Sequence, residues 1–331
     1  MEFQVVKFHF RAPVMLSKGS VDYTDIDQTL HSDTLKNALF VCALQLFGKE
    51  AINHEFFHQF TISSAFPFFE NEFFFPKPFV RLPFEFEGQT EPYHYAKKVK
   101  KLLWLGKSVF EAVCRAETVT IKNGQFSENN RFLSRQLTHL NRRSVVLTEE
   151  QQRVKINYAA DSEPYYASRI RFEPGAGFYV LLQSDATFFS KILKPAFRLL
   201  GENGLGSYKN LGNGFFEPEF SNSPLILSLP ARPNAWVALS LYCPHKEEIT
   251  TSLLQQSHYQ LIKRGGYLAS PENVRFMSWR KKSVYMFQEG SVFPASDKPK
   301  GKLADVTPSG LPHPVYRDGQ ALFFPLTIPT P

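Results

Sequence analysis

Residues 199–216 read LLGENGLGSYKNLGNGFF, and this glycine loop contains Gly201, Gly204, Gly206, Gly212 and Gly214. Glycine adopts positive φ without steric cost and lets another group approach the backbone closely. An apolar helical pattern precedes the loop and a Phe-rich strand pattern follows it, so both ends of the loop are fixed. Backbone N–H groups held in this way, with Lys209 beside them, suit an anion such as a phosphate. A mobile surface turn is the alternative that glycine content alone leaves open.

The length and composition favour a folded chain with about two domains. The chain has 331 residues, enough to bury a sizeable core, and its hydrophobic content of 43% excludes a mainly disordered protein. Phenylalanine is abundant, with 33 residues that often stand in clusters such as FPFF and EFFFP. Because each ring removes much apolar area from water, such clusters suit buried sheets or a large interface.

Positive charge is concentrated in one part of the chain. The formal net charge is +7, and residues 95–155 alone contain 13 Lys and Arg against 5 Glu. A concentrated positive patch favours a polyanionic partner such as nucleic acid. A solvated, solubilising surface is the alternative.

Three widely spaced cysteines, Cys42, Cys114 and Cys243, form no CxxC pair, which argues against a disulfide framework or a structural zinc site. The first residues, MEFQVVKFHF, alternate in polarity and lack the apolar run of a signal peptide. No uninterrupted apolar segment is long enough to span a bilayer. We therefore expect a cytoplasmic protein.

The first part of the chain predicts a strand, a helix and then a series of strands. Strand 2–10 precedes a helix that begins at the sequence HSD, where Ser32 or Asp33 can cap it, and Gly48 ends it. Extended segments at 61–69 and 72–78, a short basic helix at 95–105 and an irregular, polar stretch at 125–143 follow. We interpret that polar stretch as an insertion that a partner could order.

Strand patterns at 165–172 and 177–183, joined by EPGA, predict a hairpin. Asp185 caps the next helix, in which Pro195 predicts a kink, and the glycine loop and a strand at 215–220 follow it. A proline-containing linker leads to a second series, with strand 236–242, helix 246–256 and strands at 259–264, 274–279 and 283–287. Two successive strand-helix-strand-strand units predict an α+β fold with a duplicated sandwich.

The sequence His54-Glu55-Phe56-Phe57-His58 matches the H-E-x-x-H pattern of zinc hydrolases. On an α-helix, His54 and His58 would share a face and could hold zinc, with Glu55 as the base. The segment is short, however, and runs directly into a strand pattern, where Glu70 and Glu72 are the nearest candidates for a third ligand. Zinc hydrolysis therefore remains a weakly supported alternative.

Two further groups of residues suit RNA. His31, at the start of the first helix, could contact RNA or act as a general acid or base in RNA cleavage. The run Arg280, Lys281 and Lys282 lies beside aromatic residues and could bind single-stranded RNA, or it could guard a strand edge. No Walker loop, GxSxG or strand-linked GxGxxG is present, so nucleotide hydrolysis and nucleophilic catalysis have no motif behind them.

The order and spacing of several motifs resemble one known family across nearly the whole chain. The chain resembles the RAMP-superfamily subunit of type III-A CRISPR (Csm) effector complexes that caps the 5′ tag of the crRNA. The motifs that carry the resemblance are HSDTLKNALF, SSAFPFF followed by FPKP, GFYVLL, the glycine loop, FQEGSVF and HPVYRDGQAL.

This resemblance implies two ferredoxin-like (RRM-like) domains, residues 1–222 with the basic insertion at about 95–155, and residues 235–331. It also implies a non-catalytic crRNA-binding subunit that contacts the large polymerase-nuclease subunit and the first backbone RAMP subunit, with no cofactor. Carried over by position, the glycine loop with Lys209, together with His31 and Ser32, should contact the tag. Arg142 and Arg143 are further candidates for RNA contacts.

Two alternatives to an RNA-capping subunit remain open besides the zinc hydrolase. One is a RAMP endoribonuclease that processes precursor crRNA with a histidine such as His31. In enzymes of that type the glycine loop lies near the C-terminus, whereas more than a hundred residues follow it here. The other is a scaffold protein without RNA contact, in which the Phe clusters serve only interfaces.

Overall fold

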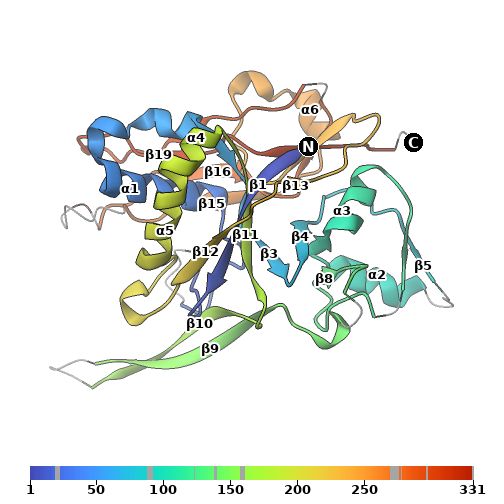
Figure 1. The fold of residues 1–331 in the computed structure, drawn as a ribbon, viewed down its shortest axis with the longest axis horizontal. Helices are drawn as coiled ribbons and strands as arrows, with labels where there is room; N and C mark the ends of the chain where they lie inside the picture. Colours follow the sequence, from blue (N-terminus) through green and yellow to red (C-terminus); the bar gives the residue numbers. More distant parts are fainter. Residues whose placement is uncertain are drawn as a thin grey trace.

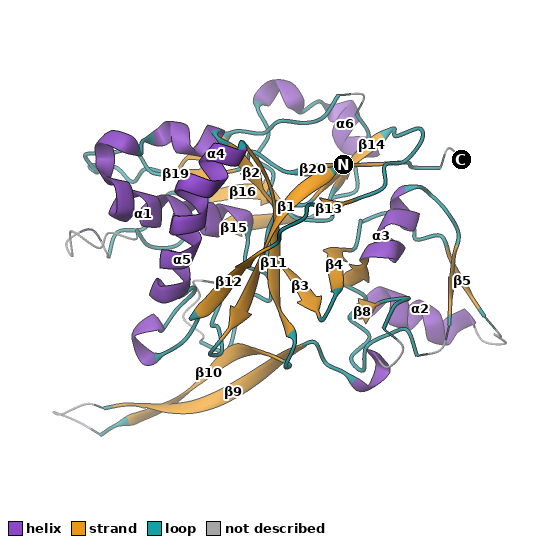
Figure 2. Ribbon diagram, in the orientation of Figure 1, coloured by secondary structure: helices purple, strands orange, loops and turns teal. Residues whose placement is uncertain are grey.

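The computed structural model describes residues 1–18, 23–87, 92–122, 124–137, 140–156, 161–268, 276, 278–295 and 297–329. Strands and helices are mixed along the chain, which confirms the α+β class (Figures 1 and 2). Within the described residues, no helix is long and apolar enough to cross a membrane.

A nine-stranded sheet forms the centre of the molecule. Strand β1 (Glu2–Phe10) lies between β11 (Ala176–Ser184) and β12 (Phe216–Phe220), antiparallel to both. Beyond β11 the sheet continues through β3 (Phe66–Phe69), β4 (Glu72–Pro76), β6 (Trp104–Gly106) and β8 (Phe132–Leu133). Two short strands complete it, β2 (Phe60–Ile62) beside β11 and β13 (Leu225–Ile226) beside β1.

Both faces of this sheet are buried, as its alternating residues show. Successive side chains of a strand point to opposite faces, so Phe3 and Val5 join one hydrophobic core while Val6 and Phe8 join another. Helices α1 (Ser32–Ala51) and α5 (Lys194–Asn203) lie side by side over the second core (Figure 1). The glycine loop follows α5 directly and therefore lies next to α1.

Helix α5 continues a shorter α4 (Ala186–Phe188) through a π-helical turn, Phe189–Leu193. Asp185 caps this assembly as predicted, because its carboxylate accepts the N–H groups of Thr187 and Phe188 at 2.8 and 3.1 Å. A kink was predicted at Pro195, and the helix is irregular just before it, in the π-helical turn Phe189–Leu193.

The predicted cap of α1 is wrong. His31 occupies the N-cap position, and its side chain makes no capping hydrogen bond. Ser32 and Asp33 lie inside the first turn, are buried, and bind residues far along the sequence instead. Gly48 does interrupt the helix near the predicted end, with φ of 79°.

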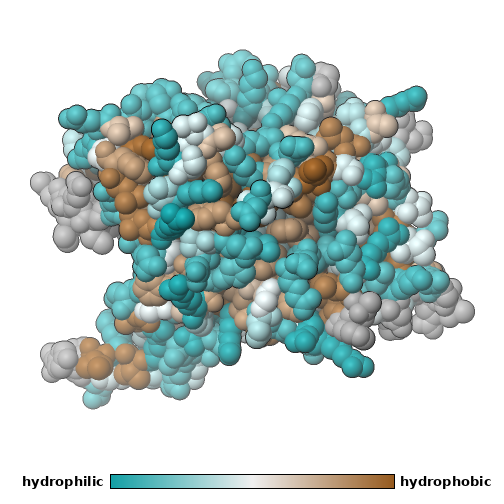
Figure 3. All heavy atoms as spheres, viewed as in Figure 1, coloured by the Kyte–Doolittle hydropathy of each residue, from teal (hydrophilic) through white to brown (hydrophobic). Residues whose placement is uncertain are grey.

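The predicted hairpin of 165–172 with 177–183 is also wrong. Strand β10 (Glu163–Phe172) pairs with β9 (Val146–Lys155), and the two form a ribbon that extends from the body (Figure 1). Strand β11 is buried along Ala176–Leu182, so it gains more from the central sheet than from a polar neighbour. Apolar atoms gather at the free end of the ribbon (Figure 3), where Val154 and Ile156 are 55% and 67% exposed.

The basic insertion folds onto the first core. It contains α2 (Pro92–Lys101), α3 (Lys107–Cys114), the 3₁₀ turn Leu140–Arg142 and the strand β7 (Val119–Ile121), which pairs with the preceding strand β5 (Phe84–Phe86). The stretch at 125–143, expected to be irregular, supplies the buried residues Phe126, Phe132 and Leu140. Its described residues are thus ordered by packing within the chain itself.

The second half of the chain shares that core. Its strand β14 (Ala235–Ala238) lies between β17 (Val292–Phe293) and β20 (Phe323–Leu326). The remaining elements are β15 (Leu261–Arg264) with β16 (Val284–Phe287), β18 (Leu303–Asp305) with β19 (Tyr316–Asp318), the 3₁₀ turn Lys246–Glu248 and α6 (Thr251–Gln256). Half of the strand predicted at 274–279 lies outside the described residues, and residues 276, 278 and 279 are described outside any strand.

Phenylalanine clusters hold the parts together. The rings of Phe75 and Phe110 stack with centroids 4.6 Å apart, and Phe110 contacts Phe324 of the second half at 5.7 Å. Residues of β1, the insertion and the second half therefore belong to one hydrophobic core. These rings serve internal packing, which weakens the alternative in which the Phe clusters serve only interfaces.

Helix α1 is also fixed to the second half by a buried ion pair. The Nζ of Lys36 lies 2.9 Å from a carboxylate oxygen of Asp318, and both side chains are almost completely buried. Removing one partner of such a pair leaves the other charge uncompensated in a poorly solvated place.

Lys36→Met should lower the free energy of unfolding by roughly 3–5 kcal/mol, because Asp318 loses its counter-charge. Adding Asp318→Asn should restore part of the loss. Urea denaturation measures both variants, with the exposed Lys191→Met as a control that stays within about 0.5 kcal/mol of the wild type. A double variant no more stable than Lys36→Met alone would contradict this account.

Candidate nucleic-acid interface

A pocket of about 640 Å³ opens between the first turns of α1, the glycine loop and the second half of the chain. We call it the α1 pocket. The residues that line it include Leu16, Ser17, Asp27, His31, Thr34, Cys42, Gly204, Gly206, Ser207, Lys209, Arg264, Lys281 and Arg317. Groups separated by more than two hundred positions in the sequence therefore meet in one cavity.

The glycine loop that forms one wall is tied down at several points. The amides of Leu205, Ser207 and Gly214 donate to carbonyls of Gly214, Met15 and Pro13 at 2.8–2.9 Å. This bonding excludes the mobile surface turn for these residues. It also means that only some of the loop amides are available to an anion. Within the described part of the chain, the N–H groups of Gly206 and Tyr208 donate no backbone hydrogen bond.

Gly214 shows why the loop requires glycine. Its φ is 79°, and a Cβ at this position would lie 1.9 Å from the carbonyl oxygen of Leu205. Gly212 has a similar φ of 84° but has open space around the same point. The predicted close approach of backbone to backbone therefore occurs at Gly214 and not at Gly212.

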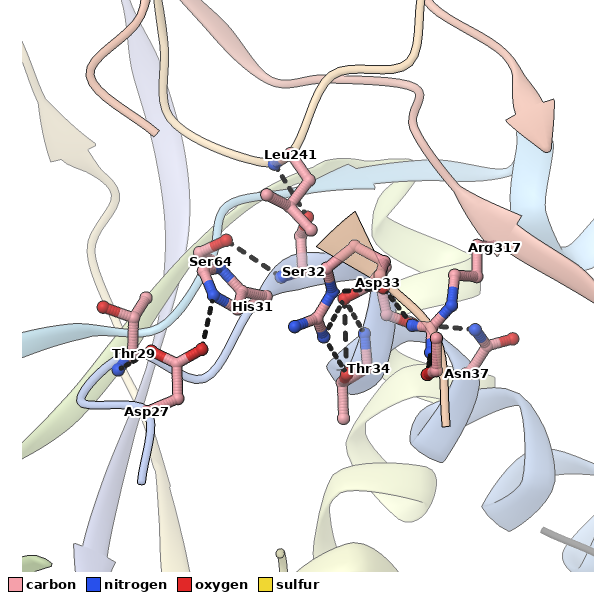
Figure 4. Close-up of polar contacts among 12 residues, drawn as sticks. Asp27, Thr29, His31, Ser32, Asp33, Thr34, Asn37, Ser64, Leu241 and Arg317 are labelled. Carbon is pink, nitrogen blue, oxygen red and sulfur yellow. Dashed lines mark hydrogen bonds and ion pairs between the residues drawn. The ribbon is translucent and has the colours of Figure 1, made fainter. Parts of the chain in front are cut away.

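His31 forms the floor of the α1 pocket at the start of α1 (Figure 4). It is 2% exposed, and its two ring nitrogens lie 2.9 Å from carboxylate oxygens of Asp27 and Glu289. Burial alone would lower the pKa of His31, but the two carboxylates outweigh it and raise the pKa to about 10. His31 is therefore a charged, fully engaged group at neutral pH.

Asp33 is the second charged group in the first turn. Its carboxylate accepts two hydrogen bonds from Arg264, at 2.9 and 3.1 Å, and a further one from Arg317 (Figure 4). Although burial acts in the opposite direction, the two guanidinium groups hold the pKa of Asp33 well below its usual range. The neighbouring Ser32 uses its hydroxyl to accept the Leu241 N–H at 3.1 Å.

Positive charge is in excess in the α1 pocket. Asp27 is the one acid among the described residues that line the pocket, and its carboxylate is bound to His31. Lys209 and Lys281 make no ion pair within the described part of the chain. Burial, and then the charge of Arg317, lowers the pKa of Lys281 to about 8, so an anion in the pocket would relieve an unfavourable concentration of charge.

The structure brings together part of the predicted RNA-binding set. His31, Gly204, Gly206, Lys209 and Lys281 all line the α1 pocket. The other predicted residues do not line it; these are Ser32, Gly201, Gly212, Gly214, Arg280, Lys282, Arg142 and Arg143.

The predicted residues outside the pocket have local roles. A Cβ at Gly201 would lie 2.3 Å from the Phe216 carbonyl oxygen, so Gly201 lets β12 approach α5. The guanidinium of Arg280 lies 4.9 Å from the centre of the Tyr267 ring, and Lys282 is exposed. Arg142 is exposed, and Arg143 forms an ion pair with Glu173 at 3.3 Å.

Sequence reasoning missed most of the charged groups that line the pocket or bind those that line it. Asp33 was noted only as a helix cap, and Asp27, Glu289, Arg264 and Arg317 were not singled out. Glu289 and Arg317 lie in the motifs FQEGSVF and HPVYRDGQAL, which gave some signal. Nothing in the sequence indicates that these two motifs meet the start of α1.

The zinc-hydrolase pattern does not form a metal site in the described residues. His54 and His58 lie on a 3₁₀ turn, where residues three apart share a face and residues four apart diverge. His54 contacts Glu55 at 3.0 Å, and His58 contacts Gln320 at 2.9 Å. No group of three or more possible metal ligands occurs in the part of the chain that the structure describes.

Comparison with known proteins gives matches along the whole chain. Residues 232–326 match the family model described as the CRISPR Csm4 C-terminal domain. The "CRISPR system Cms protein Csm4" of Thermococcus onnurineus is 27% identical, over 97% of this chain and 98% of the relative. The protein of the same name from Streptococcus thermophilus is 26% identical, over 94% of both chains.

Solved structures share the fold. A chain from the crystal structure of a Csm1–Csm4 cassette with cA4 has a TM-score of 0.64 at 22% identity, and the match covers 100% of both chains. A chain from a Csm3–Csm4 subcomplex of the type III-A CRISPR-Cas interference complex has a TM-score of 0.63 at 18% identity, over 99% of this chain and 100% of that one.

Gly214→Ala should destabilise the protein by about 3 kcal/mol or more, because the new Cβ meets the Leu205 carbonyl and the backbone must shift. Gly212→Ala should cost only roughly 1–2 kcal/mol, the penalty of positive φ alone. Chemical denaturation of the two variants measures the difference. Equal losses would show that the close approach at Gly214 is absent.

The stabilising effect of His31 should depend on pH. Its pKa is raised in the folded protein from 6.5 to about 10, so its contribution is complete below pH 6.5 and declines as the pH rises toward 10. Thermal unfolding across this range should show the wild type losing its advantage over His31→Gln. A constant difference between the two proteins would contradict a charged His31.

Proposed function

We propose that this chain, a Csm4-type RAMP subunit of type III-A CRISPR effector complexes, holds the 5′ tag of the crRNA and bridges two neighbouring subunits. The family match at residues 232–326 and the full-length relatives confirm the resemblance seen in the sequence. The subunit joins the large polymerase-nuclease subunit to the backbone RAMP filament, in line with the Csm1–Csm4 and Csm3–Csm4 assemblies among its structural neighbours.

The α1 pocket is the observation that carries the RNA-binding part of this proposal. It combines Lys209 and Lys281, which form no ion pair with any described residue, with a rigid glycine loop and an excess of positive charge. A phosphate contributes the negative charge that this pocket lacks, and charged hydrogen bonds to phosphate are strong in a partly buried place. The sugar-phosphate backbone of a single-stranded tag therefore fits the pocket.

The predicted site residues take four roles. Lys209, Lys281 and the amide of Gly206 contact phosphates of the tag. His31 and Ser32 hold the start of α1 in place, because their polar atoms are already bound within the protein. Gly201, Gly204, Gly212 and Gly214 shape the loop, whereas Arg280, Lys282, Arg142 and Arg143 attract RNA from positions outside the pocket.

Two ferredoxin-like units account for the architecture. In the first, the strand order β12-β1-β11-β3 is the order 4-1-3-2 of that fold, with α1 and α5 as its two helices. In the second, β20-β14-β17 repeats the order 4-1-3, and His258 bridges to Val292 where the remaining strand belongs. We assign the units to residues 1–222 and 235–331, with the basic insertion at about 95–155 inside the first.

A non-catalytic role agrees with the environment of His31. A general base must offer a free nitrogen near neutral pH, whereas both nitrogens of His31 are engaged and its pKa is raised to about 10. This arrangement argues against an endoribonuclease that depends on His31. We place the subunit in the cytoplasm, where a guide-RNA complex would act.

Lys209→Ala and Lys281→Ala should each weaken binding of a synthetic RNA with the repeat-derived 5′ tag by about tenfold. Each should also reduce the slope of log K against log salt by about 1, because one phosphate contact is lost. Fluorescence anisotropy at several salt concentrations, with full-length protein, measures both effects.

Arg232→Ala removes an exposed charge that does not line the α1 pocket, so it should leave the affinity and the slope nearly unchanged. Equal behaviour of all three variants would contradict a phosphate site in the pocket. Cleavage of the tagged RNA by the wild type without metal would support the endoribonuclease instead.

A further inference from the structure

Three tyrosines meet beside the glycine loop and have no part in the function proposed above. Tyr23 precedes α1, Tyr165 lies on β10, and Tyr208 lies within the loop. The ring centroids of Tyr23 and Tyr165 are 5.3 Å apart, and those of Tyr23 and Tyr208 are 6.0 Å apart. We call Tyr23, Tyr165 and Tyr208 the tyrosine cluster.

The tyrosine cluster borders the α1 pocket. Ser207 and Lys209, on either side of Tyr208, both line the pocket. Tyr23 is fixed to the ribbon, because its carbonyl accepts the N–H of Ser168 at 3.1 Å. A chain whose phosphate lies beside Lys209 therefore has its next base within reach of these rings.

The cluster combines a rigid interior with an exposed ring. Tyr208 is half-buried, and burial together with hydroxyl contacts to Tyr165 and Tyr23 raises the pKa of its phenol well above the ordinary value. The guanidinium of Arg153 lies 5.3 Å from the centre of its ring. Tyr23, by contrast, is 45% exposed, so an aromatic surface stays open at the pocket rim.

The backbone of Tyr208 is strained. Its φ of 55° and ψ of 35° lie in the left-handed region, which costs a bulky residue of order 1 kcal/mol or more. Glycine occupies most other positive-φ positions of this loop and would adopt this one freely. The strain that persists at Tyr208 therefore accompanies its ring, and strain of this kind gathers at binding sites.

We propose that the tyrosine cluster is a nucleobase-binding subsite, in which a base next to the phosphate held in the α1 pocket stacks on Tyr23, supported by Tyr208 and Tyr165. This inference rests on the function proposed above and adds a stacking contact to its phosphate contacts. Aromatic rings beside a cationic groove are the combination that binds single-stranded RNA. A nucleotide offers both a base for the ring of Tyr23 and a phosphate for the adjoining positive charge.

The test combines protein variants with abasic RNA. Synthetic RNA with the repeat-derived 5′ tag is made with one abasic position at a time, and binding to full-length wild type and to Tyr23→Leu is measured. One abasic position should weaken wild-type binding roughly 5- to 100-fold, and the same position should have almost no further effect in Tyr23→Leu. Tyr23→Phe keeps the ring and should behave like the wild type.

Tyr208→Gly removes the supporting ring and should weaken RNA binding. Because glycine adopts the left-handed conformation freely, this loss cannot be assigned to a backbone that no longer fits. Tyr166→Leu is the matched control, because Tyr166 is 56% exposed on the opposite face of β10 from Tyr165 and should leave binding unchanged. Replacing the base at the sensitive position with 5-iodouridine should give a photocrosslink to Tyr23 or Tyr208, identified by mass spectrometry.

The outcomes separate this inference from the function on which it depends. If the tagged RNA binds and Lys209→Ala weakens it, but no abasic position couples to Tyr23, the stacking subsite is refuted and the phosphate site stands. If the tagged RNA does not bind the wild type at all, the proposed function itself fails. A crosslink from a partner subunit to Tyr23 in the assembled complex, with no RNA crosslink, would assign the cluster to a protein interface.

Discussion

The contact on which the structure most depends is the one between Asp33, in the first turn of α1, and the guanidinium groups of Arg264 and Arg317. A buried carboxylate is costly unless it is paired, and here the two partners come from the other half of the chain. His31, two residues earlier, likewise contacts Glu289 of the second half. The start of α1 is thereby fixed between the two halves, and three of these charged groups, His31, Arg264 and Arg317, line the pocket beside it.

The sequence predicted the parts of the fold that depend on local patterns. Neighbouring residues indicate the alternation in β1, the Asp185 cap and the glycine loop, and the structure has all three where they were predicted. The pairing of β10 with β9 is not local, because the apolar strand β11 fits the central sheet better than the hairpin that its turn suggests. The prediction that Ser32 or Asp33 caps α1 failed for a related reason, because both side chains bind residues far along the chain instead.

The candidate site shows the same division. Lys209 and Lys281 could be singled out because each stands in a distinctive local motif, but no pattern reveals that they share a pocket with Arg264 and Arg317. The H-E-x-x-H pattern is the opposite example, because the local sequence matches a zinc motif closely. The segment forms a 3₁₀ turn, however, and its two histidines make unrelated contacts. Resemblance over the whole chain succeeded where single motifs did not, because it carries the spacing that tertiary contacts impose.

The position of Arg317 has a consequence for the order of events during synthesis. Proteins leave the ribosome from the N-terminus, so α1 and the glycine loop emerge well before the residues that complete the pocket. Both guanidinium partners of Asp33 follow the glycine loop in the chain, and Arg317 is the later of the two. A chain interrupted before Arg317 would leave Asp33 with Arg264 alone and the cavity unfinished, so the pocket is complete only once Arg317 has been made.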